Sequence, residues 1–166
     1  MTLPAPLGVP SVGRRLAAFL YEGVLLFGVL MVAGWLYAGL TQQRHALQGK
    51  TGLQLFLFVV LAVYFVWFWT HGGQTVAMKT WRVKVVARNG QPLGQWRALA
   101  RYLASWLWFV PALSAIELSG LKSGVAMGGT VLAGVLAYAG LVWLHPERQF
   151  LHDVLCGTRV IDATRH

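Results

Sequence analysis

The sequence predicts an all-α integral membrane protein, a four-transmembrane-helix bundle with a small cytoplasmic two-stranded β element. Hydrophobic residues make up 57% of the 166 residues and charged residues only 11%, whereas soluble domains have about 45–50% apolar and about 25% charged residues. The apolar residues form blocks that are too long for buried strands. Eight Trp and a net charge of +9 complete the pattern. A disordered chain, a disulfide scaffold and an ordinary soluble enzyme are excluded.

The four apolar blocks are each long enough to cross a hydrocarbon core of about 30 Å, at about 1.5 Å per helical residue. They cover residues 16–40, 52–70, 99–118 and 124–144. Only residues 119–123 separate the last two blocks, so we expect an antiparallel helical hairpin there. One domain then covers residues 1–166, with cytoplasmic segments at 71–98 and 145–166.

The distribution of Lys and Arg predicts that both termini lie in the cytoplasm. With four spans, Arg44, Lys50 and Lys122 fall on the outer side, and the other eleven of the fourteen basic residues lie on the side of the termini. Cytoplasmic loops are enriched in Lys and Arg. The Arg14-Arg15 pair resembles a twin-arginine leader, but the apolar run after it is too long for a signal peptide. We therefore expect a multi-pass protein of the cell (inner) membrane.

The segment 71–98 carries strand and turn signals. Apolar and basic residues alternate over residues 80–85, which is typical of an amphipathic strand. Asn89-Gly90 then predicts a tight turn. We expect a short β-branched run at residues 158–161 to pair with residues 82–86 and to form a small cytoplasmic sheet.

The segment between the fourth span and this β-branched run contains a predicted helix. Pro146 is suited to a first helical turn, and Gly157 ends the helix after about Cys156. The metal-binding residue types near this helix are His145, His152, Asp153 and Cys156. Their spacing is not that of a tight metal site, so we predict no metal and no other cofactor.

Charged residues inside the apolar spans are the strongest candidates for a functional site, because a charge near the bilayer centre costs roughly 2.5–3.5 kcal/mol. Glu22 lies in the first span, and Arg101 enters the third span from the same side. We expect Glu22 to pair with Arg101. For Arg15 we expect either a cytoplasmic acid, with Asp153 as the best candidate, or a lipid phosphate. Two interpretations of this polar network stay open: a structural carboxylate that locks the helix register, or a titratable, ion-binding or proton-binding group.

Other surface features suggest partners. Arg82 and Lys84, on the polar face of the predicted strand, are suited to contact anionic lipid headgroups. Gly129, Ala133 and Ala137 recur every four residues in the fourth span. Such a stripe allows close approach of a helix, either from the same chain or from another subunit of a homo-oligomer. The basic residues are split among loops, so we expect no nucleic-acid partner. No nucleophile–base arrangement or phosphate-binding loop is visible, so we expect no enzyme.

Several motifs in order resemble the RDD family of membrane proteins, which is named for one arginine and two aspartates. Arg15 precedes an acid, Glu22, by seven positions, as the first Arg does in the family. The glycine-rich second motif is similar to residues 73–79, with Gly73, Gln74, Thr75 and Lys79, and is followed by the strand and turn described above. The closing His-Asp resembles His152-Asp153, with Gly157-Thr158 after it. This chain departs from the family at Glu22, which replaces the first aspartate, and at Ala77, which replaces a common Gly.

The resemblance implies a membrane fold for most of the chain and suggests transport of a ligand that is not identified. Cation/proton exchange is proposed for some members of the family. Our first hypothesis is a small transporter of ions or solutes, coupled to protonation of Glu22. The second is a non-transporting membrane adaptor that binds lipid or a partner protein through its basic cytoplasmic segment.

Overall fold

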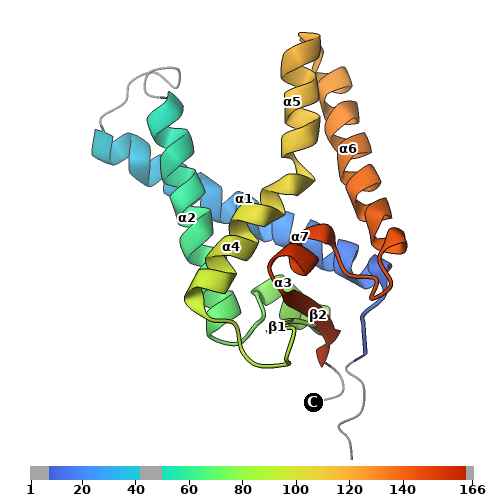
Figure 1. The fold of residues 1–166 in the computed structure, drawn as a ribbon. Helices are drawn as coiled ribbons and strands as arrows, with labels where there is room; N and C mark the ends of the chain where they lie inside the picture. The colour runs from blue at the N-terminus through green and yellow to red at the C-terminus, as the bar shows by residue number, and fades with distance from the viewer. Residues whose placement is uncertain (1–7, 42–49, 164–166) are drawn as a thin grey trace, which may run out of the picture.

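The computed structural model describes residues 8–41 and 50–163. Its long helices are α1 (Val12–Thr41), α2 (Lys50–Thr70), α4 (Gln95–Ser105), α5 (Val110–Ser119) and α6 (Gly124–Gly140). The short elements are α3 (Val76–Thr80), β1 (Val83–Ala87), η1 (Trp106–Trp108), η2 (Leu141–Leu144), α7 (Leu151–Leu155) and β2 (Thr158–Asp162). Figure 1 shows α1 crossing behind α4 and α7, the α5–α6 hairpin diverging from α2, and the small sheet at one end.

Three helical segments are long and apolar enough to cross a membrane: Val12–Thr41, Lys50–Thr70 and Gly124–Leu144. A fourth candidate span, α4 to α5, is bent by 41°. The span expected at residues 99–118 is therefore built from two helices with a break between them. Pro111 lies in the first turn of α5, where its missing N–H and its ring prevent the helix from continuing from the preceding turn, and the 3₁₀ turn η1 occupies the break.

The helices α5 and α6 form the expected hairpin. A Cβ placed on Gly134 would lie 2.7 Å from the Ala112 Cβ, so the two helices approach closely because position 134 has no side chain. Gly129, Ala133 and Ala137 are instead exposed. The contact within the chain thus uses a different face of α6 from the small-residue stripe.

The two strands pair as the sequence predicts. Strands β1 and β2 are antiparallel, with Val83 opposite Asp162 and Ala87 opposite Thr158. Gly73 packs against this sheet with φ +73°, and a Cβ there would lie 2.4 Å from the Val85 carbonyl oxygen. The carbonyl oxygen of Gly73 accepts a hydrogen bond from Val85 N at 2.8 Å, which holds the glycine against the strand. Glycine is required at this position because both the positive φ and the close approach exclude a side chain.

The helix expected from Pro146 to about Cys156 is shorter than predicted, because it covers only Leu151–Leu155. His145 is extended, as residues before proline usually are, and Arg148 has φ +49°. A positive φ at a residue with a side chain interrupts a right-handed helix. Residues 145–148 therefore form a turn, closed by the bond from Arg148 N to His145 O at 2.9 Å, before α7 begins.

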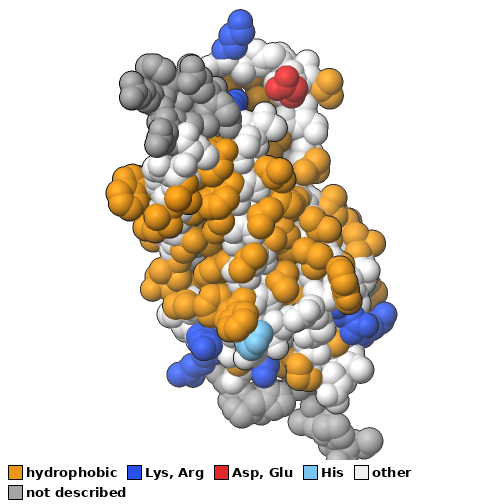
Figure 2. All heavy atoms as spheres, turned by 90° about the vertical axis from the view of Figure 1, so that its left-hand side faces the viewer, with side chains coloured by type: hydrophobic (Ala, Val, Ile, Leu, Met, Phe, Trp, Pro, Cys, Tyr) orange, Lys and Arg blue, Asp and Glu red, His pale blue; other side chains and the backbone are white. Residues whose placement is uncertain are grey.

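Apolar side chains cover the middle of the molecule, and Lys and Arg gather mainly at the end that holds the sheet (Figure 2). Beneath this surface, one buried cluster joins α2, α4 and the sheet around Trp69, Val85 and Tyr102. A second cluster, around Trp108, Tyr138 and Phe150, joins η1 to α6 and α7. The polar site described next lies between these two clusters.

Candidate functional site

An ion pair joins Arg101 of α4 to Asp153 of α7. Arg101 Nε donates to Asp153 Oδ1 at 2.8 Å, and both side chains are buried. The guanidinium also lies 4.2 Å from the centroid of the Trp69 ring, which gives it a cation–π contact. The prediction that Arg101 pairs with Glu22 is therefore wrong: its partner is the second acid of the network.

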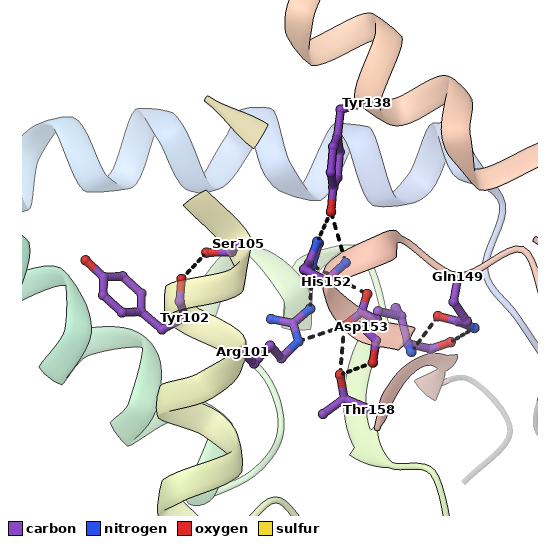
Figure 3. Close-up of polar contacts among 9 residues, drawn as sticks. Arg101, Tyr102, Ser105, Tyr138, Gln149, His152, Asp153 and Thr158 are labelled. Carbon is purple, nitrogen blue, oxygen red and sulfur yellow. Dashed lines mark hydrogen bonds and ion pairs between the residues drawn. The ribbon is translucent and has the colours of Figure 1, made fainter. Parts of the chain in front are cut away.

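Asp153 accepts a further hydrogen bond from β2, and the His152 ring lies near its other oxygen (Figure 3). Thr158 Oγ1, at the start of β2, donates to Asp153 Oδ1 at 3.0 Å, and His152 Nε2 lies 3.5 Å from Oδ2. Burial by itself would raise the Asp153 pKa, but the Arg101 charge and these hydrogen bonds hold that pKa below its usual range. Asp153 is therefore an ionised carboxylate that ties α4, α7 and β2 together.

His152 connects this ion pair to α6. The Tyr138 hydroxyl accepts from His152 N at 3.0 Å and lies 2.9 Å from Nδ1. Burial lowers the pKa of His152 to about 4, so the imidazole is neutral at pH 7. The other ring nitrogen, Nε2, lies 3.5 Å from Arg101 Nη2, so the neutral imidazole bridges the Tyr138 hydroxyl and the ion pair.

Glu22 is held by hydroxyl groups rather than by a cation. Tyr64 of α2 donates to Glu22 Oε1 at 2.6 Å, and Thr75 Oγ1 donates to Oε2. Thr75 is also the N-cap of α3 and accepts from Met78 N at 3.2 Å. A single carboxylate in α1 thus fixes α2 and α3, because both of its oxygens are used.

The second motif forms the connection between α2 and the sheet. Gly73 makes the turn, Gln74 Nε2 donates to Val83 O at 2.9 Å, and Thr75 reaches Glu22. Lys79 is exposed in the last turn of α3. Three of the four motif residues therefore join the sheet to α1, and Lys79 lies at the surface.

Arg15 is buried, with 5% of its surface exposed, but it is not the ion-pair partner of Asp153 that the sequence suggested. Its guanidinium carbon lies 4.6 Å from the centroid of the Phe150 ring. Its Nε and Nη1 atoms have no hydrogen-bond partner among residues 8–41 and 50–163. Arg15 is thus a buried cation with unused donors.

The neighbouring Arg14 differs from Arg15, because it is fully engaged. Its Nη1 lies 2.5 Å from Asp162 Oδ2, and its Nη2 donates to the carbonyl oxygens of Trp81 and Arg82 at 2.8 and 3.0 Å. The start of α1 is thereby fixed to β2 and to the turn that leads into β1. The Arg82 side chain is exposed and that of Lys84 half-buried, so lipid contact by these two residues stays a prediction.

A cavity of about 350 Å³ lies along the face of α1 that carries these charges. Its polar wall contains Arg15, Glu22, Arg101 and His152. The rest of the wall is largely apolar and comes from α1, α2, α4, η1 and the sheet; it includes Phe19, Leu61, Phe65, Trp106 and Val160. Within the described residues, no three His, Cys, Asp or Glu side chains lie together as a metal site.

The sequence interpretation missed two tyrosines, Tyr64 and Tyr138, that complete the network. Tyr64 is 42 positions from Glu22, and Tyr138 is 14 positions from His152. Each lies in an apolar span where tyrosine is expected as packing or as an interfacial anchor. The signal that points to them is a tyrosine hydroxyl within an apolar span, at a position from which it can face an acid on another element.

The model of the RDD family matches residues 9–157 of the chain. No curated protein and no solved structure matches the chain significantly. The matched region includes Arg15, Glu22 and Asp153, as well as the second motif and all the long helices. The protein is therefore a member of the RDD family.

Proposed function

We propose that the protein is a non-enzymatic solute carrier, or the binding component of one, and that the cavity along α1 holds the solute. The observation that carries the proposal is the composition of its wall, in which a few convergent polar groups face an otherwise apolar space. Small-molecule sites commonly have this composition and volumes of about 300–1,000 Å³. Charged groups within apolar spans also favour a solute or ion pathway.

The contacts of Glu22 favour a positioning role for this carboxylate over direct proton coupling. Both oxygens accept hydrogen bonds from hydroxyl groups on α2 and beside α3. A group that releases and binds protons during each cycle would have to break and remake these bonds. Arg15, with unused donors at the cavity wall, is better placed to contact a solute.

The membrane, the orientation and the oligomeric state that we propose for this carrier are those expected from the sequence. We place it in the cell (inner) membrane with both termini in the cytoplasm, since the basic residues gather at the sheet end of the molecule. Four spans leave little room for alternating access, so transport requires more than one copy. The exposed stripe of Gly129, Ala133 and Ala137 supplies a surface for such a homo-oligomer.

The adaptor remains the second candidate, supported by the basic surface at the sheet end. Arg82 and Arg88 are exposed there, and each basic side chain near an anionic leaflet contributes about 1 kcal/mol of attraction. In this case the buried charges serve the fold alone. The adaptor predicts that no reconstituted sample moves any solute.

The test is flux into proteoliposomes over a panel of inorganic ions and small carboxylates. Gly23→Leu fills the cavity, because Gly23 is part of its wall and no atom lies within 4 Å of a Cβ at that position. Gly34→Leu is the matched control, since it makes the same change on α1 away from the cavity, also with open space. We expect flux in the wild type and in Gly34→Leu, and its loss in Gly23→Leu. Equal flux in all three proteins contradicts the cavity as the site.

A further inference from the structure

The unused donors of Arg15 define the chemistry that its site lacks. A guanidinium has five N–H donors in a planar fork and no acceptor. Here one face of that fork lies against Phe150, and Nε and Nη1 are buried without a hydrogen-bond partner among the described residues. Nε together with one Nη is the edge that binds a carboxylate or phosphate in a bidentate manner.

The acids of the site are already engaged elsewhere. Asp153 accepts from Arg101 and Thr158 through Oδ1, and its Oδ2 lies 3.5 Å from His152 Nε2. Glu22 accepts from Tyr64 and Thr75. Arg101 has Asp153 as its counter-ion, and His152 is neutral at pH 7. Of the charged groups in the cavity wall, Arg15 is therefore the one that can take an additional anion.

The space beside Arg15 is suited to a hydrocarbon chain. Phe19 and Leu26 of α1, Leu61 and Phe65 of α2, and Trp106 of η1 contribute to its wall. Leu20, which is 68% exposed, and Gly23, also exposed, lie at the edge of the cavity. Both belong to the apolar helix α1, so in a bilayer the cavity opens toward acyl chains rather than toward water.

We infer that the cavity binds an anionic amphiphile, whose carboxylate or phosphate headgroup accepts hydrogen bonds from Arg15 and whose acyl chain lies along the apolar wall. This inference rests on the proposed function, because it names the class of solute that the carrier would hold. A fatty acid and an anionic phospholipid share the required chemistry. The acyl chain accounts for the apolar wall of the cavity, and the anionic headgroup accounts for the buried guanidinium of Arg15.

The experiment measures lipid binding to the purified full chain by native mass spectrometry in a neutral detergent. The probes are palmitic acid, phosphatidylglycerol, and cetyl alcohol as a neutral molecule of the same chain length. Acetate and inorganic phosphate test the headgroup alone. We expect adducts with palmitic acid, phosphatidylglycerol or both, and none with the alcohol; the adduct mass identifies the source.

Two pairs of variants locate the binding site. Arg15→Gln removes the cation, and Arg97→Gln removes an exposed cation from α4. We expect the first to weaken binding about tenfold or more, the effect of losing one charge-assisted hydrogen bond, and the second to leave it unchanged. Gly23→Leu should abolish binding of the acyl chain, and Gly34→Leu should not. If Arg15→Gln does not fold, Gly23→Leu tests the same site without changing its charge.

The inference is overturned if cetyl alcohol binds as well as palmitic acid does. It is also overturned if Arg15→Gln or a folded Gly23→Leu binds the amphiphiles as the wild type does. The third contradicting result is that the protein binds neither the amphiphiles nor acetate or phosphate. Binding of free phosphate or acetate without binding of either amphiphile overturns the acyl-chain part and leaves a simple anion site. Flux of inorganic ions without amphiphile binding preserves the proposed function and removes this inference. Amphiphile binding without any flux supports this inference and contradicts the proposed function.

Discussion

The two buried acids of this protein, Glu22 and Asp153, are stabilised by different partners. Asp153 lies beside the sheet and is neutralised by the buried guanidinium of Arg101. Glu22 lies in α1 and accepts from two uncharged hydroxyls. Loss of the charge on Asp153 would leave a cation buried, whereas loss of the charge on Glu22 would leave two hydroxyls that can rotate to other partners. The two acids are thus expected to differ in what their removal costs.

The largest effect is expected for Asp153→Asn. Removing one partner of a buried ion pair leaves the other charge uncompensated, which costs about 3–5 kcal/mol in the free energy of unfolding. Denaturant unfolding in mixed micelles measures this change. The matched control is Arg88→Gln, because the Arg88–Glu147 pair has side chains that are 71% and 49% exposed and should contribute at most about 1 kcal/mol. Equal effects of the two variants would contradict the assigned role of Asp153.

The next effect is a loss of stability in mild acid that depends on His152. Its pKa is lowered by burial to about 4 from an ordinary value of 6.5, so between these values the unfolded state binds a proton that the folded state does not. The free energy of unfolding should therefore fall by about 3 kcal/mol as pH decreases from about 6.5 to about 4. Asp153, whose pKa is also lowered, adds a further loss only below this window.

Thermal unfolding in detergent at several pH values between 7 and 4 measures this dependence. His152→Asn keeps an acceptor near the Tyr138 hydroxyl and removes the titrating ring. We expect a flatter stability profile in this variant over the same pH range. An unchanged slope would assign the acid sensitivity to another group.

The smallest effect is expected for Glu22→Gln. The substitution exchanges one acceptor oxygen for an NH₂ group opposite a hydroxyl, and the mismatch costs about 1–3 kcal/mol. Tyr64→Phe removes the donor from the same hydrogen bond, so the two changes should be less than additive in the double variant. The same unfolding measurement applies. A cost as large as that of Asp153→Asn would indicate that a cation compensates Glu22 after all.

Much of the fold follows from local sequence signals. The alternation at residues 80–85 and the β-branched run at 158–161 were sufficient to predict the pairing of β1 with β2, because an amphipathic strand needs a partner. The break before α5 was not predicted, although Pro111 was visible in the sequence. Proline is tolerated within apolar spans when neighbouring helices satisfy the freed carbonyl groups, so its presence alone does not fix a bend.

The site was predicted less completely than the fold. The sequence brought Arg15, Glu22, Arg101 and Asp153 together as one group, since each lies near the same end of a span. It did not predict which acid pairs with Arg101, because that choice depends on how α7 is placed by the turn over residues 145–148. Nor did it predict hydroxyl partners for Glu22, because Tyr64 lies on a different helix and its rotation about that helix is set by packing.

The link from Arg14 to Asp162 has a consequence for synthesis of the protein. Strand β2 leaves the ribosome after the helices described above have been made, and only then can it pair with β1 and receive the side chain of Arg14. Until that moment the N-terminal end of α1 lacks its attachment to the sheet, and Asp153 lacks the hydrogen bond from Thr158. The helices must therefore enter the bilayer before the contacts that fix their relative positions exist, and closure of the sheet is a late event in biogenesis.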